Sequence, residues 1–90
     1  MKYVLNKCFG GFNVNETILK ELGYKYNYEV NPDDERLIKL IEERGVESVQ
    51  GRFSMLKVVE IPDEATDWIK TDYDGIEQII YVLNGKLNFI

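Results

Sequence analysis

The sequence predicts an α+β fold: a two-layer sandwich in which two helices cover one face of an antiparallel or mixed sheet of about five strands, with a C-terminal β-meander. Three observations predict it. The chain has 90 residues, 44% of them hydrophobic, which suits a single domain over residues 1–90. Strand and helix patterns alternate in its first half. Two dipeptides typical of hairpin turns, Asp74-Gly75 and Asn84-Gly85, separate the strand patterns near its end.

The first part of the chain is predicted to form a strand, a helix and a second strand. Lys2–Phe9 alternates loosely between apolar and polar residues and predicts the first strand. Asn15 stands where it can cap a helix, and Gly23 stands where it can end one. Tyr24–Val30 alternates strictly, with three tyrosines and a valine on one side. We therefore expect a second strand there, with its tyrosines packed against the helices.

The middle of the chain predicts a second helix and a further strand. Asn31 can cap the helix with Pro32 at its first position, and Gly45 can end it after Arg44. Residues 46–50 fit either a short strand or an irregular extension of the helix. Residues 53–61 predict a strand that stops before Pro62, because proline has no N–H for a β-ladder.

The meander is predicted from three strand patterns, Trp68–Tyr73, Ile76–Leu83 and Lys86–Ile90, joined by the two hairpin turns. Ordering a chain of this size costs nearly as much free energy as burial of its apolar residues returns. We therefore also expect a homo-oligomer.

The composition argues against several kinds of chemistry. The chain has no histidine, and Cys8 is its one cysteine. A cysteine nucleophile needs a base, and zinc sites need histidines or several thiolates. We therefore expect no enzyme activity, no metal and no cofactor. No apolar stretch approaches the length of a membrane span, so we expect a cytoplasmic protein with no membrane partner.

The net charge of −5 is concentrated in one region. Seven acids and one base lie between Glu60 and Glu77, which gives −6 there and +1 for the remainder. Such a region repels nucleic acid and suits a basic partner protein; a solvated strand edge is the plainer explanation. The residues predicted to bind such a partner are Asp63, Asp67, Trp68, Asp72, Asp74 and Glu77.

The Gly10-Gly11 pair supports two hypotheses. It most simply forms a tight turn between the first strand and the first helix, since glycine accepts unusual backbone angles. Alternatively, its N–H groups hold the phosphate of a nucleotide or sugar phosphate. The residues predicted to bind that small molecule are Lys7, Phe9, Gly10, Gly11, Phe12 and Arg52.

Several motifs, about a third of the chain, resemble small proteins of unknown function from bacteriophages and prophages of Gram-positive bacteria. They are Asn6–Phe12, Leu56–Asp63, Trp68 and Tyr73–Glu77, with Gly51–Phe53 matching a Gly-Arg-aromatic step. Similar proteins often have a tryptophan after the glutamate that corresponds to Glu77, and their chains end soon afterwards. This chain has Gln78 at that position and continues to Ile90.

The resemblance carries over no catalytic residue. It implies a non-enzymatic phage protein that modulates a host component by binding a host protein in the host cytoplasm. A protein that binds or sequesters a small signalling molecule and a structural or assembly accessory remain as alternatives.

Overall fold

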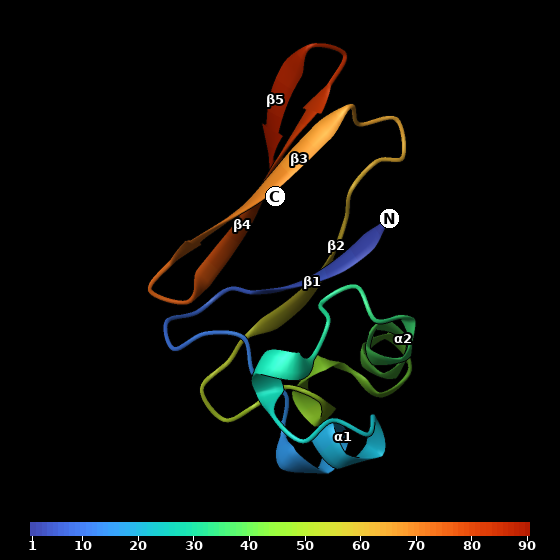
Figure 1. Ribbon diagram of the computed structural model, residues 1–90, viewed down its shortest axis with the longest axis vertical. Coiled ribbons are helices and arrows are strands. Elements are labelled where there is room, and N and C mark those ends of the chain that lie inside the picture. The colour runs from blue at the N-terminus through green and yellow to red at the C-terminus, as the bar shows by residue number, and fades with distance from the viewer.

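The α+β class is confirmed by a computed structural model, which describes residues 1–90 (Figure 1). The strands are β1 Lys2–Asn6, β2 Leu56–Glu60, β3 Asp67–Tyr73, β4 Ile76–Leu83 and β5 Lys86–Phe89. The α-helices are α1 Glu16–Glu21 and α2 Glu35–Arg44, and the short 3-10 helices are η1 Asn27–Glu29 and η2 Val46–Ser48. Neither α-helix is long and apolar enough to span a bilayer.

The strands form two antiparallel sheets, so the prediction of a single sheet of five strands is wrong. β1 pairs with β2, with Val4 opposite Val58, and β3, β4 and β5 form the meander. On the edge of β1 that faces away from β2, the Val4 N–H donates to the Pro32 carbonyl at 2.8 Å, so this N–H is not free to pair with a third strand. β2 ends just before Pro62, which cannot donate to a ladder.

The β1–β2 ribbon lies between the helices and the meander, as Figure 1 shows. On one face of the ribbon, Val4 and Leu56 belong to a buried cluster with residues of both helices. On the other face, Leu5 and Val59 pack with Ile79 of β4. The ribbon thus has a core on each side, because successive side chains of a strand point in opposite directions.

The predicted ends of the helices are largely confirmed. The Asn15 side chain accepts the Ile18 N–H at 2.9 Å, and Gly23 follows α1 with a φ of 83°. Gly45 ends α2 with a φ of 87°. However, α2 begins later than predicted: its N-cap is Asp34, because the chain first makes a turn that joins the Asp34 N–H to the Asn31 carbonyl.

The strand predicted at Tyr24–Val30 does not form. Glu29 accepts the backbone N–H groups of Lys25 and Tyr26 at 3.1 and 2.8 Å, which closes η1. Such local bonds compete with a β-ladder and outweigh the alternating pattern here. Tyr26 and Tyr28 consequently stack on each other at the surface, with ring centroids 5.4 Å apart, rather than packing against the helices.

Two other predicted strands are shorter than expected. β1 ends at Asn6 instead of Phe9, because Gly10 and Gly11 adopt φ angles of 112° and 99° in the turn that follows. β2 starts at Leu56 instead of Phe53. Of the two possibilities for residues 46–50, the structure has the irregular helical one, since residues 46–48 form η2 just after α2, and Gln50 makes an isolated bridge with Val14. The three meander strands agree with their predicted ranges to within a residue.

Asp34 links the two helices through a largely buried carboxylate. It accepts hydrogen bonds from the Tyr24 hydroxyl at 2.7 Å and from Arg36 Nη2 at 2.9 Å, and its side chain is 11% exposed. Arg36 Nη1 in turn donates to the Leu22 carbonyl at the end of α1. The hydrogen bonds from Arg36, above all, hold the pKa of Asp34 well below its ordinary value.

Replacing this carboxylate is expected to make stability less sensitive to acid. A depressed folded-state pKa means that ionised Asp34 stabilises the fold above about pH 4 and that this stabilisation is lost as the pH falls. Asp34→Asn keeps a helix cap but removes the charge, so we expect it to cost about 2 kcal/mol at pH 7 and somewhat less at pH 3, where the depressed pKa still leaves folded-state Asp34 largely ionised. Urea unfolding at both pH values measures this difference, and an equal cost at both would contradict it.

Candidate functional site

Three segments that are distant in the sequence meet beyond the end of β1. They are loop 7–12, loop 51–55 and the β3–β4 turn at residues 73–75, which we call the loop junction. The Gly10 N–H donates to the Asp74 carbonyl at 3.2 Å, and the Lys7 N–H donates to the Met55 carbonyl at 2.7 Å. Backbone hydrogen bonds therefore hold loop 7–12 against both other segments.

The fully buried side chain of Asn6 connects all three segments. Its Nδ2 donates to the carbonyls of Cys8 and Gly75, each at 2.6 Å. Its Oδ1 accepts the Met55 N–H at 2.9 Å. An amide is well suited to this place because it offers donors and an acceptor at once.

Glu77 lies beneath the loop junction rather than on the surface. Its side chain is 6% exposed, and Oε1 accepts the Asn6 N–H at 2.7 Å. Lys70 Nζ lies 3.4 Å from Oε2, and Lys7 Nζ donates to the Glu77 carbonyl at 2.9 Å. Glu77 therefore cannot contribute its carboxylate to a partner surface. Burial, together with the nearby Lys57, lowers the pKa of the Lys7 amine.

The Gly10-Gly11 pair forms the turn and also receives the β3–β4 hairpin. A Cβ atom on Gly75 would lie 2.7 Å from Gly11 Cα and 2.9 Å from Gly10 N, closer than such atoms can approach. The Gly10 N–H that an anion would need already donates to Asp74. The main chain of the protein itself thus occupies the position predicted for a phosphate.

The other residues predicted to bind a small molecule lie on the two loops that meet at the loop junction, but no pocket is lined by more than one of them. Phe12 packs against the helical core, whereas Phe9 is 64% exposed. Arg52 has no carboxylate partner, and its guanidinium lies 5.4 Å from the centre of the Phe53 ring. Both Arg52 and Phe53 line a shallow cleft of about 370 Å³ next to α1.

The loop junction exposes four large apolar or aromatic side chains, at least one from each segment: Phe9 at 64%, Phe53 at 71%, Met55 at 57% and Tyr73 at 74%. Sequence reasoning identified Phe9 only. The other three lie in or beside predicted strands, where apolar residues are expected to be buried. Their signal in the sequence is their position next to turns, at Gly51-Arg52 and Asp74-Gly75.

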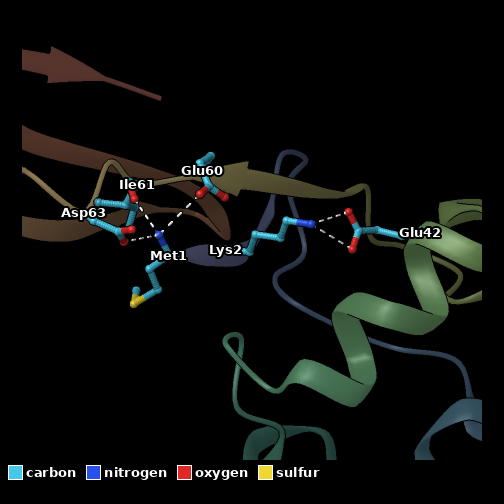
Figure 2. A network of polar contacts seen from close by, with 6 residues as sticks. All are labelled: Met1, Lys2, Glu42, Glu60, Ile61 and Asp63. Carbon is cyan, nitrogen blue, oxygen red and sulfur yellow. Dashed lines mark hydrogen bonds and ion pairs between the residues drawn. The ribbon is translucent and has the colours of Figure 1, made fainter.

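The predicted acidic surface is not one patch. Asp67 begins β3, whereas Asp72 and Asp74 lie at its other end, and a strand of this length separates them by roughly 20 Å. Trp68, 36% exposed, packs edge-on against Tyr3 at 5.4 Å. Asp63 accepts a hydrogen bond from the Met1 amine at 3.1 Å (Figure 2) and is the main cause of the raised pKa of that amine.

Figure 2 also shows how β1 is fixed at its start. The Met1 amine donates to the Ile61 carbonyl at 2.7 Å, and Lys2 Nζ lies 2.8 Å from a carboxylate oxygen of Glu42 in α2. These contacts join β1 to the loop after β2 and to the helical layer. They lie at the opposite end of β1 from the loop junction.

Comparisons of this chain with protein-family models, with curated proteins and with solved structures give no match.

Proposed function

We propose that this protein works by contact, binding a partner protein through the loop junction. The observation that carries the proposal is the exposure of Phe9, Phe53, Met55 and Tyr73 on segments that hydrogen bonds hold together. Aromatic side chains commonly supply most of the binding energy of a protein interface. Loops that a rigid scaffold positions are the usual carriers of such residues.

The support beneath these side chains favours binding without a large rearrangement. Buried Asn6 bonds to all three segments, and buried Glu77 accepts the Asn6 N–H and contacts the Lys70 amine beneath them, so the loops lose little freedom when a partner arrives. Arg52, which has no carboxylate partner, adds a cation beside the Phe53 ring. The partner surface would therefore combine apolar pockets with an acidic group near the position of Arg52.

We propose a host protein in the host cytoplasm as that partner, in keeping with the phage and prophage proteins that the sequence motifs resemble. The protein would then act without catalysis, by occupying or blocking a surface of its partner. A small-molecule binder or an assembly accessory, the alternatives that the sequence leaves open, would not need to bind a host protein through this end of the molecule.

Photo-crosslinking in a Gram-positive host tests the proposal directly. A photoreactive phenylalanine analogue replaces Phe53 in one variant and Tyr28 in another; Tyr28 is 84% exposed but lies outside the loop junction. We expect one host protein to be crosslinked from position 53 and not from position 28. Crosslinking of the same proteins from both positions, or of none from position 53, would contradict the proposal.

A further inference from the structure

The outer face of the meander is apolar and exposed. The register places Ile69 opposite Ile80, Ile80 opposite Phe89, and Val82 opposite Leu87, so these five side chains share one face. Ile79, on the other face of β4, packs against the ribbon. Ile69, Leu87 and Phe89 are 56%, 64% and 58% exposed. No part of the chain covers this outer face.

This face also combines a groove with projecting side chains. A groove of about 190 Å³ runs along it, lined by Asp67, Trp68, Ile69, Ile80, Val82 and Leu87. Phe89 stands next to the groove, opposite Ile80. A surface that carries both a groove and a projecting ring can bind a copy of itself about a two-fold axis, since each copy then fills the groove of the other.

The charges on the meander favour such a contact. Asp67 is the one charged residue that the register places on the outer face, where the others are apolar or neutral polar. The chain as a whole carries −5. Two copies can therefore meet through this face while nearly all of their acids stay apart, whereas most other orientations bring like charges together.

The outer face is also large enough to form a dimer interface of standard size. The five apolar side chains leave on the order of 400 Å² exposed, within the range of about 300–600 Å² for the largest apolar patch of a soluble monomer, and such patches are often interaction sites. An interface of standard size buries about 800 Å² on each partner, a little over half of it apolar. Thr71, Tyr73 and Gln78 of the same face supply neutral polar area for the remainder.

We propose that the outer face of the meander binds a second copy of this chain, forming a two-fold symmetric dimer. This inference does not depend on the proposed function, because the loop junction and the outer face expose different side chains apart from Tyr73 at their border. The dimer would present two loop junctions. A partner with two equivalent sites would then be bound far more tightly than by one copy.

Light scattering coupled to gel filtration, at submillimolar concentration, tests the dimer. We expect the wild-type chain to have twice the mass of one copy. Leu87→Glu places a charge in the lining of the groove on this face and is expected to weaken the dimer about 30-fold or more. The matched control is Tyr28→Glu, which places the same charge on an exposed aromatic outside the face and should leave the dimer unchanged.

A monomeric wild-type chain would overturn the inference, and so would a Leu87→Glu chain that still forms the dimer. If Leu87→Glu does not fold, a mixture of isotope-labelled and unlabelled wild-type chains tests the interface instead, through nuclear Overhauser contacts between the two copies. They are expected between the Phe89 ring of one copy and the Ile69 or Leu87 methyl groups of the other. Their absence from a sample of dimeric mass would overturn the inference too. Phe53→Ser, which affects the proposed function, is expected to leave the dimer intact.

Discussion

Gly75→Ala is expected to destabilise the protein by about 3 kcal/mol or more, since it combines backbone strain with a steric clash. Gly75 has a φ of 90°, which disfavours any residue with a Cβ. The new methyl group would also fall 2.7 Å from Gly11 Cα, so the hairpin and loop 7–12 must separate. For a chain of this length, that loss should lower the melting temperature by about 12 °C or more.

Gly85→Ala is the matched control for this substitution. Gly85 occupies the same position of the second hairpin turn, with a φ of 75°, but no atom lies within 4 Å of the Cβ that alanine would add. We expect it to cost only the backbone strain, about 1 kcal/mol. Thermal unfolding gives the loss of stability for each variant, and the difference between the two losses measures the contact of Gly75 with Gly10-Gly11. Equal losses would show that the hairpin does not rest on Gly10-Gly11.

Asn6→Leu is expected to cost about 3 kcal/mol or more, although leucine has nearly the size and shape of asparagine. The substitution leaves the Met55 N–H and the carbonyls of Cys8 and Gly75 without their partner in a buried place. Each such unpaired group costs about 1–3 kcal/mol unless the structure opens to water. We therefore also expect the exposed loops of the loop junction to become mobile.

Asn88→Leu provides the comparison, since its amide makes a single exposed bond to the Lys86 carbonyl at 3.1 Å. Its cost should stay within about 0.5 kcal/mol. Urea unfolding gives both free energies, and amide hydrogen exchange of Met55 reports on the loop junction itself. If the exchange rate of Met55 were unchanged in Asn6→Leu, Asn6 would not be what joins these segments.

Features set by neighbouring residues were predictable from the sequence. Asn15 and Gly23 bound α1, and Asp74-Gly75 and Asn84-Gly85 turn the meander, because a cap or a turn involves only a few consecutive residues. Tyr24–Val30 shows the limit of periodicity. Its alternation is real, but bonds from the Glu29 side chain to nearby N–H groups decide its conformation.

The candidate site was less predictable because it depends on contacts between distant residues. Nothing local to Asn6 or Glu77 reveals that they meet across 71 positions, nor that Glu77 is buried while Asp72 and Asp74 are not. The sequence did mark loop 7–12 as unusual. Its role, however, is to hold a hairpin whose own glycine lies 64 or more positions away, and no spacing rule connects the two.

A titration of the crosslinked host protein, once purified, tests most directly whether the loop junction is the binding surface. Isothermal calorimetry compares the wild-type chain with Phe9→Ser/Phe53→Ser and with Tyr28→Ser as the control outside the loop junction. We predict that the double variant binds about 30-fold more weakly or worse, while the control binds as the wild type does. Equal affinity of the double variant and the wild type would contradict binding through the loop junction.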